Sequence, residues 1–262
     1  MRSSSAYALP RERNLILASL LVLAAAAWAV LVWQAGDTGT MGTGPTMGLG
    51  APLFLAIWVV MMVAMMFPTT APMILTFARV QAGKRQRGEV FVPTWIFLAA
   101  YLIVWIAFGV LAFVIAVGAE QLGGQVPWVM TNAARIGGAV LILAGLYQLS
   151  PLKRVCLAKC RSPMSFILSS WRDGRGGAFR MGLAHGMYCL GCCWLLFVIL
   201  FPLGVMNVAA MAVITLLIFA EKSLPVGRRV AQVAAGALVV YGALVVLLPQ
   251  FLPTMGTMAG GM

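Results

Sequence analysis

The sequence predicts an all-α membrane protein: a bundle of seven transmembrane helices with the N-terminus in the cytoplasm and the C-terminus outside. Of its 262 residues, 62% are hydrophobic and only 9% are charged, whereas a soluble domain carries about 25% charged residues. The apolar residues form separate blocks, each long enough to cross a hydrocarbon core of roughly 30 Å. The basic residues lie in alternate segments between these blocks, which is the pattern that membrane orientation produces.

Seven apolar blocks are expected to form the spans, at about 15–33, 52–79, 93–117, 134–149, 179–201, 205–220 and 229–248. The first is longer than a signal-peptide core and no small-residue cleavage site follows it, so we interpret it as a retained helix. Only Pro202 and Gly204 separate the fifth block from the sixth. The expected organisation is a cytoplasmic segment 1–14, a membrane domain 15–248 and an external tail 249–262 rich in Gly and Met.

The distribution of charge predicts the orientation and the partners. Segments 1–14, 79–92, 150–180 and 221–229 contain 3, 4, 7 and 3 Lys or Arg residues, and the intervening segments contain only Arg135. Basic segments stay in the cytoplasm, so we expect a multi-pass membrane protein whose four basic segments face the cytoplasm. The net charge of +12 therefore suits the lipid bilayer, and nucleic acid is not an expected partner. No Gly-rich phosphate-binding motif indicates ATP-driven action.

Charged residues are absent from the middle of every predicted span, since Arg135 and Glu221 fall at block ends. Intramembrane charges usually mark proton relays and ion paths. Their absence argues against a proton-coupled transporter. The groups that remain inside the bilayer are sulfur, imidazole, hydroxyl and aromatic side chains.

The second block carries a methionine face. At about 100° per residue, one arc of roughly 140° holds Trp58, Met61, Met62, Met65, Met66, Thr69 and Met73. Pro68 and Pro72 should bend this helix. Thioethers are uncharged, soft ligands suited to Cu(I), although Met also serves as a flexible filler between helices.

The fifth block carries the single histidine, His185, and three of the five cysteines, Cys189, Cys192 and Cys193. Helical spacing points His185, Cys189 and Cys192 the same way, with Cys193 at the margin. Imidazole and thiolates at this spacing suit Cu(I), with Zn(II) as the alternative metal. Packing cysteines and a Cys-x-x-Cys redox pair are the other interpretations.

Further sulfur lies outside the predicted spans. The expected external segments hold Met41, Met47, Met255, Met258 and Met262, either as flexible arms that capture Cu(I) or as ordinary tails. Cys156 and Cys160 are expected in a cytoplasmic loop with Lys153, Arg154, Lys159 and Arg161. Because nearby positive charge favours thiolates, these two thiols are candidates for a metal relay.

Four segments together resemble a bacterial family of predicted metal-binding integral membrane proteins, some of which are linked to copper proteins as copper chaperones. The matching residues are Trp58, Met61, Ala64, Met65, Met66 and Pro68; Leu146, Pro151, Lys153, Cys156 and Cys160; His185, Gly186, Tyr188, Cys189, Gly191, Cys192, Cys193 and Trp194; and Gly204, Val205, Met206, Asn207, Glu221 and Lys222. The resemblance covers about 52–245. It implies metal binding by the Met, His and Cys positions.

Three functions follow as hypotheses. The leading one is a non-enzymatic protein that holds Cu(I) between the second and fifth helices and delivers it to a cuproenzyme or a periplasmic metal-binding protein, or transfers it across the membrane. The second is a membrane thiol oxidoreductase using Cys189 and Cys192, although Cβ atoms three apart on a helix lie roughly 5–6 Å apart, against about 3.8 Å in a disulfide. The third is a structural subunit of a membrane complex, in which Gly137, Gly138, Gly145, Gly236 and Gly242 serve helix association.

Overall fold

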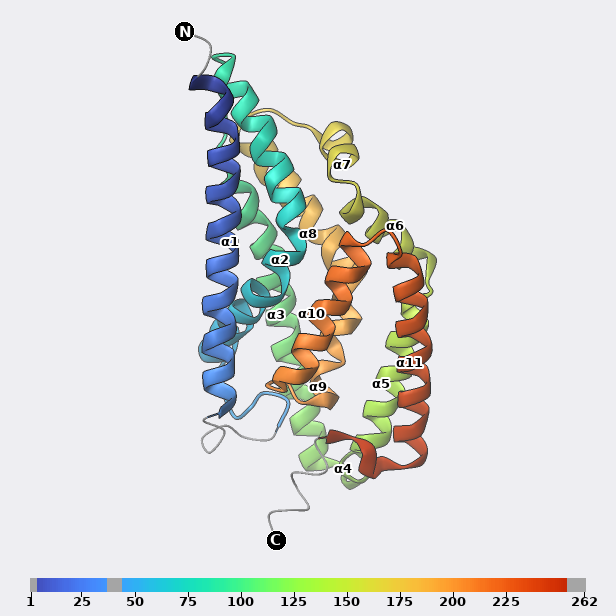
Figure 1. Cartoon of the computed structure of the whole chain (residues 1–262). Helices are drawn as coiled ribbons and strands as arrows, with labels where there is room; N and C mark the ends of the chain where they lie inside the picture. Colours follow the sequence, from blue (N-terminus) through green and yellow to red (C-terminus); the bar gives the residue numbers. More distant parts are fainter. Residues whose placement is uncertain (1–3, 37–43, 254–262) are drawn as a thin grey trace.

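A computed structural model describes residues 4–36 and 44–253, and within these residues the chain is helical and contains no strand. Each of the seven apolar blocks lies mainly in a helix. These helices are α1 (Ser4–Gly36), α2 (Ala51–Gln86), α3 (Thr94–Gln125), α5 (Ala133–Gln148), α8 (Gly174–Val198), α10 (Val208–Ser223) and α11 (Gly227–Leu247). They run side by side in an elongated bundle (Figure 1). The predicted all-α class is confirmed.

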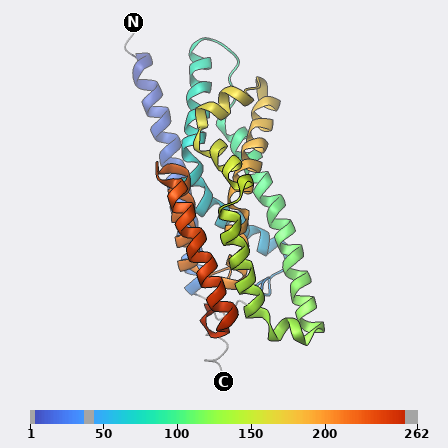
Figure 2. The same ribbon diagram turned by 90° about the vertical axis from the view of Figure 1, so that its right-hand side faces the viewer.

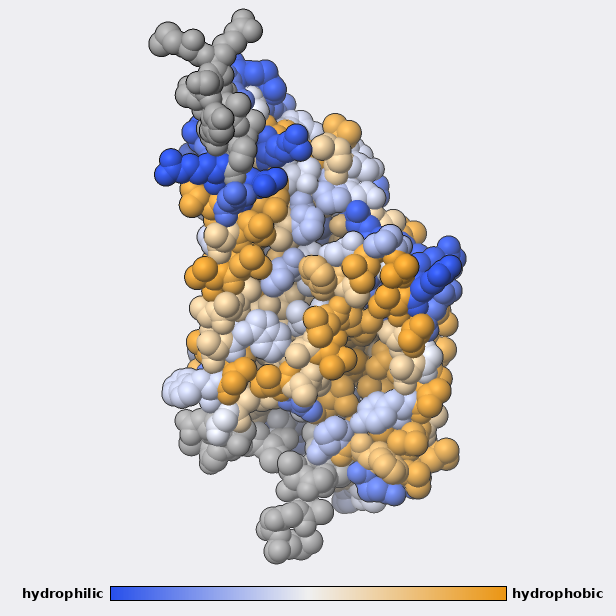
Figure 3. All heavy atoms as spheres, viewed as in Figure 1, coloured by the Kyte–Doolittle hydropathy of each residue, from blue (hydrophilic) through white to orange (hydrophobic). Residues whose placement is uncertain are grey.

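Five helices in the described residues are long and apolar enough to cross a membrane. They cover 11–36 of α1, all of α2 and α3, 174–203, which joins α8 to the short α9 (Leu200–Leu203), and α11. A sixth candidate is the pair of α5 and α6 (Pro151–Arg161), bent by 62° between them. Apolar side chains cover the middle of the visible face, and hydrophilic ones gather mainly toward the end near the N-terminus (Figure 3). This surface suits a polytopic helical membrane protein.

The methionine face of α2 points into the bundle. Met61, Met62, Met65 and Met66 are at most 1% exposed, whereas Val59, Val60 and Val63 on the other side are half-buried. Pro68 and Pro72 lie inside α2, which continues through both. Proline is tolerated within a membrane helix when neighbouring groups satisfy the freed carbonyls. Pro68 frees the carbonyl of Ala64, and the Trp28 indole of α1 donates to this carbonyl at 3.1 Å.

The predicted cytoplasmic loop at 150–180 is wrong where it concerns Cys156 and Cys160, because both lie on a helix, α6. Ser150 caps its N-terminus, with the Ser150 hydroxyl accepting from the Lys153 amide at 3.1 Å, and Pro151 opens the first turn. Serine before a helix and proline at its first position both favour helix initiation. A second short helix, α7 (Pro163–Ser170), follows, while α4 (Pro127–Thr131) links α3 to α5.

Glycines let pairs of helices pack closely. A Cβ on Gly138 would lie 2.8 Å from the Gly242 carbonyl oxygen, and one on Gly145 would lie 2.8 Å from the Ala235 carbonyl oxygen. These contacts join α5 to α11, which lie side by side (Figures 1 and 2). Gly182 does the same for α8 against α3, where a Cβ would lie 2.3 Å from the Phe97 carbonyl oxygen. Small residues therefore serve association within the chain, as expected in membranes.

Met47, one of the methionines predicted to lie outside the membrane, is packed in the protein core. Met47 is 5% exposed and packs in the main core, so a flexible arm is wrong for this residue. The Thr46 amide next to it donates to Glu120 Oε1 at 2.7 Å and ties the segment to α3. The expectation for Met41, Met255, Met258 and Met262 falls outside the described residues.

Candidate metal centre

A thioether from α2 and a thiol from α8 meet inside the bundle. Met66 Sδ and Cys189 Sγ lie 4.0 Å apart, and both residues are 0% exposed. Two metal–sulfur bonds of about 2.3 Å, the length of a zinc–thiolate bond, would span this distance at an angle of about 120°. Met66 of α2 and Cys189 of α8 thus turn soft donors toward one another. A third donor would complete a trigonal set.

Lys222 is a member of this site that sequence reasoning missed. Its Nζ donates to Cys189 Sγ at 3.1 Å and lies 3.5 Å from Thr69 Oγ1, while the residue is only 8% exposed. The Tyr101 hydroxyl lies 3.1 Å from the same sulfur. Lys222 lies in the last turn of α10, where hydropathy alone places a lysine at the membrane surface. The available signal was its place beside Glu221 in the fourth segment of the family resemblance.

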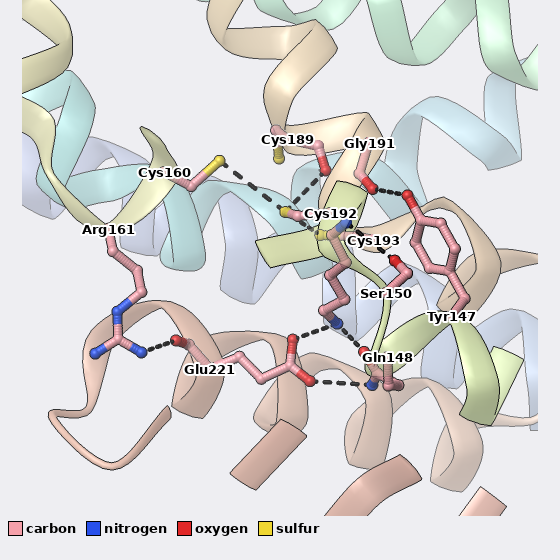
Figure 4. A network of polar contacts seen from close by, with 11 residues as sticks. Tyr147, Gln148, Ser150, Cys160, Arg161, Cys189, Gly191, Cys192, Cys193 and Glu221 are labelled. Atoms are coloured by element: carbon pink, nitrogen blue, oxygen red, sulfur yellow. Dashed lines mark hydrogen bonds and ion pairs between the residues drawn. The ribbon is translucent and has the colours of Figure 1, made fainter. Parts of the chain in front are cut away.

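The other cysteines gather where α6 packs against α8. Cys192 Sγ lies 3.1 Å from Cys193 Sγ and 4.0 Å from Cys160 Sγ, and its thiol donates to the Cys189 carbonyl at 3.1 Å (Figure 4). Cys156 lies against Gly191, where a Cβ would be 2.7 Å from its sulfur. The two thiols of α6 therefore belong to the same sulfur-rich region as those of α8. No disulfide joins cysteines in the described chain.

His185 lies in an aromatic setting one helical turn before Cys189. Its ring centroid is 5.5, 5.7 and 5.9 Å from those of Phe166, Tyr101 and Phe97. The residue is 2% exposed, and within the described residues its Nδ1 has no hydrogen-bond partner. Over 4–36 and 44–253, no three His, Cys, Asp or Glu side chains converge to hold a metal ion. In the described residues, His185 and the α8 cysteines therefore do not form one complete ligand set.

The remaining predicted methionine ligands are as deeply buried as Met66. Met61, Met62 and Met65 belong to the same buried cluster as Cys156, Cys189, Cys192 and Cys193. Met66 is the methionine that brings its sulfur to a thiol. Met61, Met62 and Met65 are therefore further buried soft donors on the same arc of α2.

Lys153 and Arg161, predicted to favour thiolates, pair elsewhere. Lys153 Nζ lies 2.6 Å from Glu221 Oε2 and also donates to Gln148. The Gln148 amide in turn donates to Glu221 Oε1 at 3.0 Å (Figure 4). Arg161 donates to the carbonyl oxygens of Glu221 and Leu224, both at 2.8 Å. Buried charges need such partners because desolvation is costly. These two cations anchor α6 to the end of α10. Lys222, in contrast, contacts the Cys189 thiol.

The comparisons with known proteins bear on this same region. Residues 55–245 match the PpoB2 family, described as copper chaperones. No curated protein and no solved structure gives a significant match. The matched range includes Met66, Cys160, His185, Cys189 and Lys222, and it agrees with the segments that carried the resemblance in the sequence. Because the match extends over well over half of the chain, this protein belongs to the PpoB2 family of copper chaperones.

Proposed function

We propose that this protein is an integral membrane chaperone that binds Cu(I) between α2 and α8 and delivers it to a cuproenzyme in or beyond the membrane. The observation that carries the proposal is the contact between Met66 Sδ and Cys189 Sγ at 4.0 Å, inside a chain of a copper-chaperone family. Copper is the cargo of this protein. The two sulfurs are its first ligands.

The chemistry of the donors favours Cu(I) over other ions. A thioether needs no deprotonation and a thiolate cancels the single charge of Cu(I), so the bound ion adds no net charge to the bilayer interior. Zn(II) prefers four thiolate, imidazole or carboxylate ligands. Cys192 and Cys193 on α8, and Met61, Met62 and Met65 on α2, are the candidates for the third ligand.

We propose seven spans with the N-terminus in the cytoplasm of a bacterial cell, and the inner membrane as the location. The alternation of basic segments supports this topology, as does the fact that each apolar block lies mainly in a helix. In this orientation the α6–α7 end of the bundle faces the cytoplasm. Fusions of alkaline phosphatase, active only outside the cytoplasm, should be active after residue 248 and inactive after residue 88. The reverse activities would contradict the orientation.

Copper binding is tested on protein purified without oxygen. The wild type should bind at least one Cu(I), and the double variant Cys189→Ser with Cys192→Ser should bind none at this site. Met66→Leu keeps the side-chain size but removes the sulfur, and we expect Cu(I) affinity to fall by about tenfold or more. The matched control is Met211→Leu, because Met211 is equally buried but lies on α10. Equal losses in both methionine variants would contradict the assignment of Met66.

A second candidate function, thiol oxidation, is favoured by one contact. Cys160 and Cys192 come from different helices and their sulfurs lie 4.0 Å apart, which removes the geometric objection to a disulfide within one helix. Such an enzyme would pass two electrons from this dithiol to an acceptor such as a quinone. Mass-tag alkylation after acid quenching separates the two functions. A Cys160–Cys192 disulfide that forms and is reduced during growth would favour the redox function.

A further inference from the structure

A cavity of about 180 Å³ lies beside the Met66–Cys189 pair, on the α6–α7 side of the bundle. Five helices, α2, α6, α7, α8 and α10, contribute its lining, which consists of Thr69, Thr70, Pro72, Met73, Cys160, Arg161, Pro163, His185, Lys222 and Ser223. The volume is several times that of a water molecule. An ion together with part of its ligands would fit in it.

Three soft or borderline donors line this cavity, each from a different helix: Met73 from α2, Cys160 from α6 and His185 from α8. The imidazole is the most informative of them. Its Nδ1 is buried and lacks a hydrogen-bond partner in the described chain, although buried polar atoms in folded proteins are nearly always paired. A metal ion is one partner that satisfies such a nitrogen, because neutral imidazole is a common ligand.

Two lining residues join the cavity to thiols of α8, one of them in the Met66–Cys189 pair. Lys222 lines the cavity and its Nζ contacts Cys189 Sγ at 3.1 Å. Cys160 lines the cavity and its sulfur lies 4.0 Å from Cys192 Sγ. An ion in the cavity would therefore be one ligand exchange from the α8 thiols. Lys222 and Arg161 also give the cavity positive charge, which opposes a divalent cation more strongly than a monovalent one.

We propose that this cavity is a second Cu(I) site, formed by Met73, Cys160 and His185, which exchanges the ion with the Met66–Cys189 pair. The proposal rests on the copper function proposed above and adds a position from which a cytoplasmic partner can load or unload the protein. Transfer is ligand exchange: each new copper–sulfur or copper–nitrogen bond forms as another breaks. A thiol that binds releases its proton, and no electron is transferred.

The two sites differ in their donors, and this difference provides the test. The Met66–Cys189 site contains sulfur alone, whereas the cavity site adds a nitrogen. In the variant Met66→Leu with Cys189→Ser, we expect one Cu(I) to remain, with both copper–sulfur and copper–nitrogen scattering in X-ray absorption. Adding His185→Phe, which preserves a ring among the aromatic neighbours, should remove the nitrogen signal and this last equivalent of copper.

The thiol of the cavity gives an independent readout. Cu(I) should slow the alkylation of Cys160 by a maleimide, both in the wild type and in the Met66→Leu, Cys189→Ser background. Cys156 is the matched control, because it lies on the same helix but packs against Gly191 rather than lining the cavity. Cys160→Ser should lower the copper stoichiometry, and Cys156→Ser should not.

The outcomes separate this inference from the proposed function. If the wild type binds Cu(I) but His185→Phe and Cys160→Ser change neither stoichiometry nor the nitrogen signal, the cavity site is refuted and the sulfur pair stands. If the wild type binds no Cu(I), both are refuted. Retained helical circular dichroism and a single elution peak show that each variant is folded.

Discussion

The buried pair of Lys153 and Glu221 offers the sharpest test of what positions the site. Both side chains are at most 2% exposed and their charged atoms lie 2.6 Å apart, with Gln148 bonded to each. Replacing one partner leaves the other buried without compensation, which costs about 3–5 kcal/mol. We therefore expect Glu221→Leu and Lys153→Met each to lower the free energy of unfolding by about this amount.

The double variant should recover most of this loss, because apolar replacement of a whole buried ion pair is often neutral or stabilising. Unfolding in mixed micelles with increasing dodecyl sulfate measures all four proteins of the cycle. The ion pair of Lys84 and Asp173 is the control, because the Asp173 side chain is largely exposed. Hydrogen bonds from the Lys84 ammonium and the Trp171 indole lower the pKa of the Asp173 carboxyl. Because exposed ion pairs contribute little, Asp173→Asn should change the free energy of unfolding little. Single variants as stable as the wild type, or a double variant as unstable as the singles, would refute the reasoning.

Two further substitutions test the metal environment and the packing. Lys222→Leu removes a cation that lies 3.1 Å from Cys189 Sγ and adds no sulfur ligand. Since this charge opposes a second positive charge on the metal, we expect the affinity for Zn(II) relative to Cu(I) to rise at least about tenfold in competition titrations. An unchanged ratio would contradict the role of Lys222. Gly138→Val places side-chain atoms against the Gly242 carbonyl oxygen, since even a Cβ at this position would lie 2.8 Å from it. Such overpacking should lower the free energy of unfolding by about 1–3 kcal/mol. Its control is Gly236→Ala, since a Cβ there has nothing within 4 Å; equal effects of the two in the same unfolding assay would argue against close α5–α11 packing.

Sequence reasoning recognised the helices because hydropathy is a local property. Twenty or so apolar residues form a helix in a bilayer whatever their neighbours are, since the backbone must satisfy its own hydrogen bonds. The arcs of Met61–Met66 on α2 and Cys189–Cys193 on α8 follow from helical periodicity alone. The loop expected around Cys156 and Cys160 was wrong because α6 is short and polar, and its stability comes from packing on α8 rather than from its hydropathy.

The sequence by itself therefore determined the all-α class, the apolar blocks and the segments rich in soft donors. Only the tertiary structure decided which donors meet, since contacts between Met66 and Cys189, or between Cys160 and Cys192, join residues 123 and 32 positions apart. It also decided that Lys222 is buried beside a thiol and that His185 faces a cavity. Both features depend on how helices distant in sequence cross. The glycine contacts and the Lys153–Glu221 pair fix these crossings, and no local sequence pattern encodes them.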